Sequence, residues 1–427
     1  MEVLISVLGL VVFIAIAFLF SSNKKKISWR TVISALVLQV VLGLIVLKTP
    51  VGRWVFGKLA EGVQKLLAYA NEGINFVFGS LAGPDKIDDL GFVFAFKVLP
   101  IIIFFSALIS ILYYLGIMQV VIRKIGWALQ KALGTSKLES LSAAANIFLG
   151  QTEAPLVIKP YLGKLTRSEL FTVMTSGMAS IAGSVLGAYA AMGVPPEYLL
   201  AASVLAAPGG LIFAKLIYPE TEESQEKEEE ILKLEEEEKK NFFEALANGA
   251  LAGLKVALNV AAMLIAFVAL IALINGILGG VGGLFGYEGL SFQSILGYLF
   301  SPLAFLMGVP DNWSDALLVG SLMGTKLAVN EFVAYLDLSK YLKTRLAGAE
   351  EWVEGEKQKL SPKTVAIITF ALCGFANFSS IGIILGGLGG LAPGSRKSVI
   401  SRLGLKALLA GTLVSLLSAT IAGILFI

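Results

Sequence analysis

Two short stretches place amide, hydroxyl and carboxyl side chains inside segments that are otherwise mostly hydrocarbon. Residues 143–155 contain Gln151 and Glu153, and residues 326–333 contain Glu331. A carboxylate at membrane depth costs on the order of a few kcal/mol, so it usually serves a ligand, an ion or a proton. We therefore expect the two stretches to face each other and to share one binding site.

Other polar side chains in the chain suggest what such a site binds. Asn146 and Ser180 offer neutral oxygens, which together with nearby backbone carbonyls suit a hard cation such as Na⁺. The amides of Gln151 and Asn377 donate and accept at once, as a nucleobase edge or a sugar requires. An ionised Glu331 only accepts, so it fits two neighbouring hydroxyls of a ribose.

Each of these side chains also has a purely structural interpretation. Ser180 and Ser380 could bond to carbonyls of their own helices, and Asn146 could join two helices. Glu153 and Glu331 would be surface loop residues if the segments around them do not enter the membrane. The grouping of polar residues at matched interruptions favours a binding site over these alternatives.

The composition indicates an α-helical integral membrane protein. Hydrophobic residues make up 56% of the 427 residues, above the level of soluble domains, and the mean hydropathy is +0.81. They form blocks of about 17 or more residues, long enough to cross the hydrocarbon core of a bilayer. The net charge of +3 gives no reason to expect nucleic acid as a partner. One cysteine and no histidine exclude His-based catalytic triads and the usual zinc sites.

Eight segments are predicted to span the membrane, namely 3–20, 31–47, 92–115, 170–194, 198–217, 245–278, 364–388 and 406–427. Residues 52–78 and 118–133 mix charged with apolar residues, which is typical of amphipathic helices at an interface. Two further segments, 139–163 and 314–340, are interrupted around their glutamates. We expect each of them to enter the membrane and return as a hairpin.

Charge and glycine patterns predict the connections. The basic residues of 24–30 should be cytoplasmic, which places the N-terminus outside, and an even number of spans places the C-terminus outside as well. A second basic group, at 396–402, predicts a cytoplasmic loop before the last span. Glycines at 279–283 predict a turn after the long segment 245–278. The glutamate-rich residues 220–240 read as a solvated cytoplasmic linker.

The chain also reads as two halves of similar pattern. Each half has an amphipathic segment, an interrupted hairpin with a polar residue beside a glutamate, and a span with small and hydroxyl residues in its middle. Residues 152–153 correspond to 330–331, and 179–183 correspond loosely to 379–382. Counting the spans between corresponding segments predicts that the two halves have opposite orientations in the membrane. Inverted repeats with broken helices are typical of secondary transporters.

Several motifs resemble the signatures of concentrative nucleoside transporters, most closely those of the bacterial Na⁺-coupled members. The motifs are NIFLGQTEAP at 146–155, NEFVAY at 330–335, CGFANFSSI at 373–381 and AAPGG at 206–210. The resemblance covers nearly the whole chain in order. It implies eight transmembrane helices, two oppositely oriented re-entrant hairpins, an inverted repeat, and a homotrimer with an elevator-like transport domain.

The resemblance also implies roles for individual residues, carried over by position. The nucleobase would be bound by Gln151, Thr152 and Glu153. The ribose would be bound by Glu331, Asn377 and Ser380, with Phe375 lining the pocket and packing on a ring face. Na⁺ would be held by the side chains of Asn146 and Ser180 and by the carbonyls of Leu149 and Ile181. Leu149 is bulkier than the valine expected at its position, a change that a carbonyl ligand should survive.

The same resemblance divides the chain into regions. Residues 1–116 would be scaffold helices with an external amphipathic helix, and residues 117–217 the first repeat of the transport domain. Residues 218–241 would be the glutamate-rich cytoplasmic linker, residues 242–278 a long scaffold helix, and residues 279–427 the second repeat.

We therefore predict a Na⁺-driven importer of nucleosides such as uridine, cytidine or adenosine, a multi-pass protein of the cell (inner or plasma) membrane and not an enzyme. The alternative within transport is H⁺ coupling with Glu153 or Glu331 as the proton carrier, against which Asn146 and Ser180 argue. A membrane-embedded hydrolase would need a Glu or Lys base beside a serine nucleophile, and no such spacing appears. A passive channel fits less well, because an amide-rich site favours tight binding over throughput.

Overall fold

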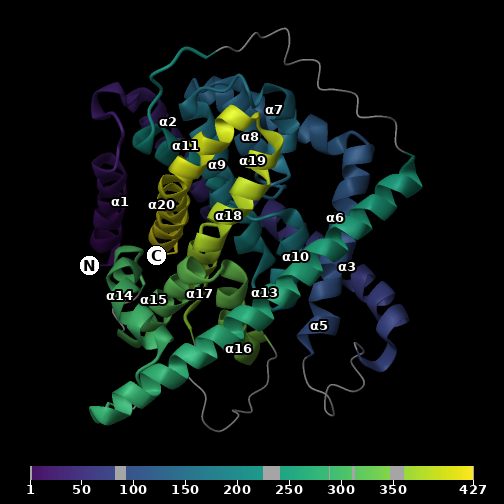
Figure 1. Cartoon of the computed structure of the whole chain (residues 1–427), viewed down its shortest axis with the longest axis vertical. Coiled ribbons are helices and arrows are strands. Elements are labelled where there is room, and N and C mark those ends of the chain that lie inside the picture. Colours follow the sequence, from purple (N-terminus) through teal and green to yellow (C-terminus); the bar gives the residue numbers. More distant parts are fainter. Residues whose placement is uncertain are drawn as a thin grey trace.

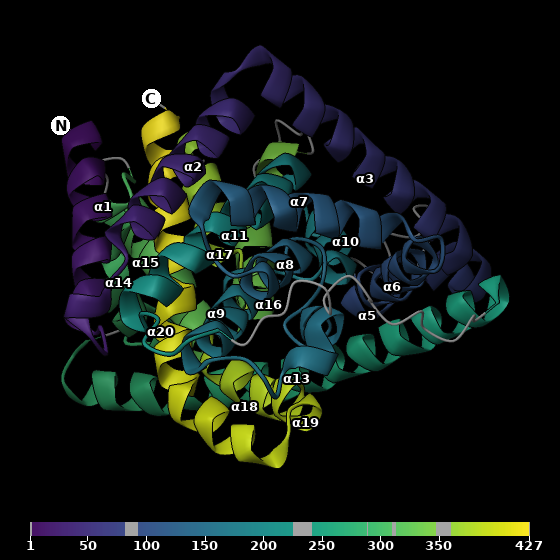
Figure 2. The same ribbon diagram turned by 90° about the horizontal axis from the view of Figure 1, so that it is seen from above.

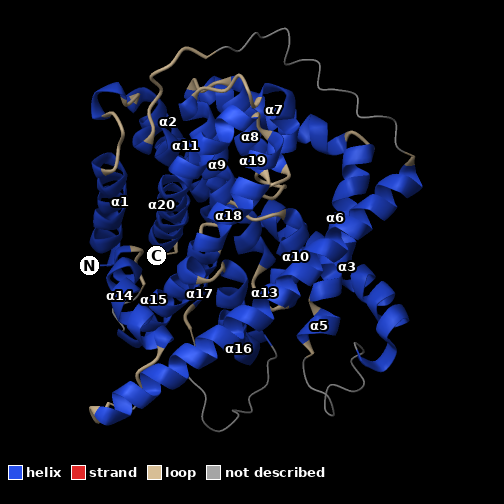
Figure 3. Ribbon diagram, in the orientation of Figure 1, coloured by secondary structure: helices blue, strands red, loops and turns tan. Residues whose placement is uncertain are grey.

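The computed structural model describes residues 2–81, 93–224, 241–287, 289–309, 313–346 and 360–426. Within these residues every regular element is a helix (Figure 3), in agreement with the predicted all-α class. The two termini lie near each other at one edge of the molecule in both perpendicular views (Figures 1 and 2). Most of the predicted glutamate-rich linker, residues 225–240, lies outside the described part of the chain.

The chain begins with the helices α1 (Glu2–Leu19), α2 (Trp29–Lys48) and α3 (Pro50–Phe78), with the 3₁₀ turns η1 (Lys24–Lys26) and η2 (Gly79–Leu81). The side chain of Thr49 caps α3 by accepting a 3.0 Å hydrogen bond from the Gly52 N–H. Buried residues recur along α3 at three- and four-residue intervals, namely Ala60, Val63, Leu67, Ala70 and Ile74. One face of this helix therefore packs on protein, as an amphipathic helix at 52–78 should.

The next segment is kinked, and a long helix crosses it. α5 (Phe94–Lys97) and α6 (Leu99–Tyr114) are separated at Val98, two residues before a proline that lacks the N–H a continuous helix needs. α13 (Phe242–Leu284) packs along α6 and runs as a long diagonal in Figure 1. A Cβ atom on Gly253 would lie 2.7 Å from the Cα of Ile103, so only glycine allows this close crossing.

The end of α13 corrects one prediction. The turn expected at 279–283 is wrong, because those glycines remain helical and the helix continues to Leu284. A glycine in a helix costs about 1 kcal/mol relative to alanine, which is too little to end a helix of this length. The chain turns instead at Gly286 and Gly289, which have φ values of 70° and 116°.

The first interrupted segment is a helix followed by a 3₁₀ arm. After α7 (Ile117–Leu133) come α8 (Lys137–Ala145) and η4 (Ala154–Tyr161), and residues 146–153, here called the first tip, join them. η4 is not the α-helix of a regular hairpin, because its Pro155 and Pro160 lack the backbone N–H groups of an α-helical ladder.

The span predicted at 170–194 is broken in its middle. α9 (Arg167–Ala179) and α10 (Gly183–Ala191) are separated by residues 180–182, here called the first break. Ser180 has extended backbone angles, φ −114° and ψ 170°, so the helical ladder stops there. α11 (Pro196–Ile217) follows as predicted and begins at its proline pair.

The second half of the chain also contains two interrupted segments. α14 (Phe292–Leu306) precedes α15 (Trp313–Ala328) and α16 (Glu331–Leu346), which are joined at residues 329–330, here called the second tip. α17 (Pro362–Leu372) and α18 (Phe378–Gly386) are separated by residues 373–377, here called the second break, where the sequence predicts a polar interruption.

The last helix corrects another prediction. After α19 (Leu388–Leu391), α20 runs from Gly394 to Leu425, so the basic residues of 396–402 are helical and the loop predicted there is wrong. Lysine and arginine are good helix formers, and a proline immediately before Gly394 suits a helix start. The group of basic residues at 396–402 therefore does not mark a loop.

The buried core lies among α8–α11, α15–α17 and α20, whereas α1, α3 and α13 expose large apolar side chains. The most apolar window of α13 is 17% buried, against 94% for that of Arg167–Ala191. In the described residues, six helical stretches are long and apolar enough to cross a membrane, judged by length and composition, with α5–α6 and α9–α10 counted as one stretch each. A buried central block surrounded by exposed apolar helices is the arrangement that a hydrocarbon environment stabilises.

Candidate functional site

The two breaks meet inside the core. The backbone N–H of Phe375 donates a 3.1 Å hydrogen bond to the carbonyl of Ser180, so residues far apart in the sequence share one peptide contact. Gly374 beside it has φ 132°, and a Cβ there would lie 2.7 Å from the Ala179 carbonyl oxygen. A left-handed glycine without a side chain is what allows this approach.

The first tip contacts the first break. The backbone N–H of Gly183 donates a 2.9 Å hydrogen bond to the Phe148 carbonyl. A Cβ on Gly150 would lie 3.2 Å from the Cβ of Ala182, which is closer than an ordinary van der Waals contact. The polar residues of the first tip are therefore held beside the non-helical backbone of the first break.

The second tip holds Glu331 at the start of α16. Asn330 caps this helix, because its Oδ1 accepts a 2.9 Å hydrogen bond from the Val333 N–H. Glu331 is buried, and its carboxylate accepts one bond from the Tyr189 hydroxyl and one from Asn377 Nδ2, each 3.0 Å long. The helix N-terminus carries partial positive charge that further stabilises a carboxylate.

A chain of hydrogen bonds continues from Glu331 to the first tip. Asn377 caps α18 through Oδ1, which accepts from the Ser380 N–H at 2.9 Å. Gln151 Nε2 donates to Ser380 Oγ at 3.2 Å. Within the described residues the buried Gln151 Oε1 has no hydrogen-bond partner. An acceptor without a partner at this depth is available to a donor on a ligand.

Three of the predicted substrate residues lie close by but outside that chain of bonds. Glu153 Oε2 accepts from the Gly150 N–H of its own turn at 3.1 Å. The Thr152 methyl packs against α18–α19, since a Cβ on Gly387 would lie 2.5 Å from it. Phe375 joins the two breaks through its backbone N–H, which donates to the Ser180 carbonyl, and the Phe375 side chain is half-buried.

The predicted cation residues surround the first break. Asn146 is buried, its Nδ2 donates to the Ser142 carbonyl at 2.8 Å, and its Oδ1 has no partner among the described residues. The Ser180 hydroxyl donates to the Ser176 carbonyl at 3.1 Å. Leu149 and Ile181 are buried outside the helices, and in the described part of the chain neither carbonyl accepts a backbone hydrogen bond. An amide oxygen without a partner and carbonyls that accept no backbone hydrogen bond are ligands of the kind that a hard cation takes.

Two participants in this cluster are not evident from the sequence pattern. Tyr189 lies in an apolar run with no polar neighbour to mark it, and only the packing of α10 against α16 brings it to Glu331. Ser379 adjoins a predicted residue, and its hydroxyl donates to Asn377 Oδ1 at 2.6 Å. The signal that could have identified Tyr189 is a tyrosine in a run of alanines and glycines.

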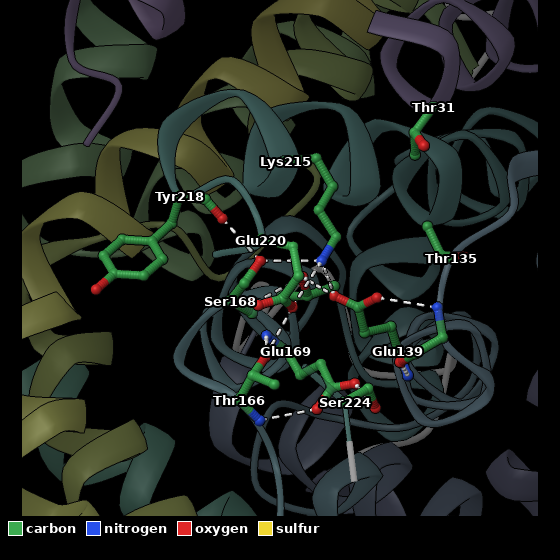
Figure 4. Close-up of polar contacts among 12 residues, drawn as sticks. Thr31, Thr135, Glu139, Thr166, Ser168, Glu169, Lys215, Tyr218, Glu220 and Ser224 are labelled. Atoms are coloured by element: carbon green, nitrogen blue, oxygen red, sulfur yellow. Dashed lines mark hydrogen bonds and ion pairs between the residues drawn. The ribbon is translucent and has the colours of Figure 1, made fainter. Parts of the chain in front are cut away.

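A second buried polar cluster lies away from the tips (Figure 4). Lys215 on α11 pairs with Glu139 on α8 and donates to the Ser168 hydroxyl on α9 at 2.9 Å. Glu139 also accepts from the Thr172 hydroxyl at 2.8 Å, and the Glu220 carboxylate accepts from the Thr166 hydroxyl at 2.7 Å. These contacts connect the N-terminal turn of α8 to the start of α9 and the end of α11.

The fold and the buried polar cluster define a multi-pass helical membrane protein with its polar site inside the bundle. Three family models match the chain. Residues 8–81 match the N-terminus of the Na⁺ dependent nucleoside transporter, residues 95–196 match a nucleoside recognition (gate) model, and residues 198–423 match the C-terminus of that transporter.

Individual proteins agree with these matches. The nucleoside permease NupC of Helicobacter pylori is 53% identical over 99% of this chain and 97% of its own length. Human sodium/nucleoside cotransporter 1 is 50% identical over 100% of this chain, which spans 64% of the human protein. A structure of CNTnw in an inward-facing substrate-bound state superposes with a TM-score of 0.92 at 52% identity, covering 100% of this chain and 98% of the other. The chain belongs to the Na⁺-dependent nucleoside transporter family.

Proposed function

We propose that this chain is a symporter that carries a nucleoside into the cell together with Na⁺. The observation that carries the proposal is the joint between the Phe375 N–H and the Ser180 carbonyl. The Ser180 hydroxyl and the Ile181 carbonyl, two of the proposed ion ligands, lie on one side of this backbone contact, and Asn377, which pairs with Glu331, lies on the other. Broken helices that meet inside a bundle are the usual binding sites of secondary transporters.

The substrate residues divide into two groups in this proposal. Gln151, Thr152 and Glu153 on the first tip bind the nucleobase. Glu331, Asn377 and Ser380 bind the ribose hydroxyls, and Phe375 lines the site. The free Gln151 Oε1 accepts from the base, and Glu153 keeps one oxygen on its own turn while the other faces the ligand. Ribose hydroxyls bind Glu331 as donors, which a carboxylate requires.

The ion residues are the Asn146 and Ser180 side chains and the Leu149 and Ile181 carbonyls. Na⁺ bound there draws the first tip onto the first break, which orders Gln151 for the nucleobase. Ion and substrate then bind cooperatively, because each favours the same conformation. A proton carried by Glu153 or Glu331 is the competing form of coupling.

The proposed architecture has eight membrane spans and two opposed re-entrant hairpins, α8–η4 and α15–α16, in an inverted repeat. Residues 1–116 and α13 form a scaffold, while residues 117–217 and the chain after α13 form the moving transport domain. The boundary predicted at 278 moves to the end of α13 at Leu284. Residues 218–241 are a cytoplasmic linker between the two. The transport domain moves as an elevator within a homotrimer in the cell membrane, and both termini face outside.

Uptake of radiolabelled uridine into proteoliposomes tests the function and the coupling together. With an inward Na⁺ gradient we expect accumulation, and with an inward H⁺ gradient or none we expect equilibration only. Glu331→Gln should weaken uridine binding by more than about 100-fold while the protein stays folded. Accumulation driven by H⁺ alone would keep the nucleoside assignment and reject the ion assignment. No uptake by folded protein under any gradient would reject uridine as the substrate, and the same result with cytidine and adenosine would reject the nucleoside assignment.

A further inference from the structure

A buried positive charge lies beside the second break, and the substrate and ion assignments leave it unused. Lys326 on α15 is buried, and its Nζ donates to the Ala371 carbonyl at 2.8 Å and to Ser415 Oγ at 2.9 Å. The Ser415 hydroxyl in turn donates to the Cys373 carbonyl at 3.0 Å. One ammonium group therefore serves two carbonyls at the end of α17, one directly and one through a hydroxyl.

These carbonyls need a donor because α17 stops here. In a continuous helix the Ala371 carbonyl would accept from the N–H of the residue four positions on, which is Phe375. That N–H donates instead to the Ser180 carbonyl in the first break. Lys326 supplies the donor that the joint between the breaks removes, and a buried carbonyl without a donor is costly.

The charge of Lys326 matters beyond its hydrogen bonds. The C-terminal end of a helix carries partial negative charge, which a cation within the last turn stabilises. α17 ends at Leu372, and the next residues are those of the second break that carry Phe375 and Asn377. An ammonium held at this point fixes where the break begins, and thereby where Asn377 is presented to Glu331.

The first break differs in this respect. The contacts described there come from neutral groups, namely the Asn146 amide and the Ser180 hydroxyl, and Asn146 Oδ1 has no partner within the described residues. The Asn146 and Ser180 oxygens proposed to hold Na⁺ at the first tip and first break are neutral, whereas the second break is stabilised by an ammonium group of the chain itself.

We propose that Lys326 is a positioning residue for the substrate, a tethered cation that holds the second break in its ligand-binding geometry. It is the fixed counterpart of the exchangeable Na⁺ at the first break. The inference rests on the proposed nucleoside site, since its effect is read through Asn377 and Glu331. Without the ammonium, the competent form of the break is a smaller fraction of the protein, which lowers the apparent affinity for the ligand.

The experiment compares two buried lysines of the same bundle in the full chain, purified in detergent with saturating Na⁺. The variants are Lys326→Met and Lys326→Gln, with Lys215→Met as the matched control. Lys215 is equally buried and pairs with Glu139, away from both breaks. The readouts are the uridine dissociation constant, the Na⁺ concentration at half-maximal uridine binding measured near each variant's own dissociation constant, and the melting temperature.

We expect both Lys326 variants to raise the uridine dissociation constant about 10- to 100-fold. The half-maximal Na⁺ concentration should stay within about twofold, because the ion site lies at the other break. Lys215→Met should lower the melting temperature at least as much as Lys326→Met, yet keep uridine affinity within about twofold of wild type.

Three results would overturn the inference. Lys326→Met that binds uridine as wild type does would show that the ammonium positions nothing. Equal weakening by Lys326→Met and Lys215→Met would show a general loss of stability, and full affinity in Lys326→Gln would show that a neutral donor suffices. Wild-type protein that fails to bind uridine would instead reject the proposed function, and this inference with it.

Discussion

Tyr189 and Glu331 lie 142 positions apart in the sequence, and the Tyr189 hydroxyl donates a 3.0 Å hydrogen bond to the Glu331 carboxylate. Both side chains are buried, and the Tyr189 ring packs at 4.6 Å, centroid to centroid, on the ring of Tyr335. The bond ties α10, from the first half of the chain, to the residue proposed to bind ribose in the second half. Tyr189 therefore orients a carboxylate that lies 142 positions later in the sequence.

Tyr189→Phe should weaken uridine binding about tenfold or more, because a hydrogen bond to a charged group is lost while the ring packing remains. Equilibrium binding of labelled uridine measures the effect. Tyr335→Phe is the matched control, since its hydroxyl donates to the backbone carbonyl of Thr369 at 2.8 Å and not to Glu331. Equal losses of affinity in the two variants would contradict an orienting role for Tyr189.

Asn146→Ala should raise the Na⁺ concentration at half-maximal uridine uptake about tenfold. The change removes the partnerless Oδ1 that faces the proposed ion position. Initial uptake rates across a series of Na⁺ concentrations provide the measurement. Asn275→Ala serves as a control, because that amide bonds to Gln293 and the Phe292 N–H near the end of α13. Unchanged Na⁺ dependence in Asn146→Ala would remove this residue from the ion site.

Gly374→Ala should destabilise the joint between the breaks by about 1–3 kcal/mol, since the φ of 132° is strained for any side chain. The added Cβ would also lie 2.7 Å from the Ala179 carbonyl oxygen. We expect lower affinity for uridine and weaker dependence of that affinity on Na⁺, measured in one binding titration. Gly382→Ala is the control, because an added Cβ there meets no atom within 4 Å. If uridine affinity in Gly374→Ala depends on Na⁺ as it does in wild type, the hydrogen bond between the two breaks is not needed for coupling.

Lys215→Met should lower stability by about 3–5 kcal/mol, because it leaves the Glu139 carboxylate buried without its ion-pair partner. Thermal unfolding in detergent measures this as a lower melting temperature. The double variant Lys215→Met with Glu139→Gln should recover most of the loss, since the unpaired charge is removed as well. A double variant no more stable than the single one would indicate that packing around Lys215, and not the ion pair, sets the cost.

Much of the fold was predictable because membrane depth imposes strong constraints on sequence. Long apolar runs and the polar interruptions at 146–155 and 373–380 locate most helices, the first tip and the second break. The first break, at 180–182, falls inside a segment predicted as one continuous span. The misplaced ends have a local cause. Glycines at 279–283 and basic residues at 396–402 resemble turn and loop patterns, but the modest cost of glycine within a long helix and the good intrinsic propensity of Lys and Arg leave both segments helical.

The site was predictable as a set of residues and less so as a set of contacts. The Gln151–Ser380 and Glu331–Asn377 pairs join residues that the motifs already single out. The partners of Tyr189 and Lys326 depend on how α10, α15 and α20 pack, which local patterns do not encode. A buried lysine in particular reads from the sequence as a side chain that reaches for the interface.

The bond between the Phe375 N–H and the Ser180 carbonyl is made entirely by main-chain atoms. Exchange of either side chain leaves the donor and the acceptor in place, so the two halves of the site can diverge separately in what they select. A change of preferred base or sugar need not weaken the connection to the driving ion. Selectivity and energy coupling can therefore evolve, or be engineered, as separate traits of this molecule.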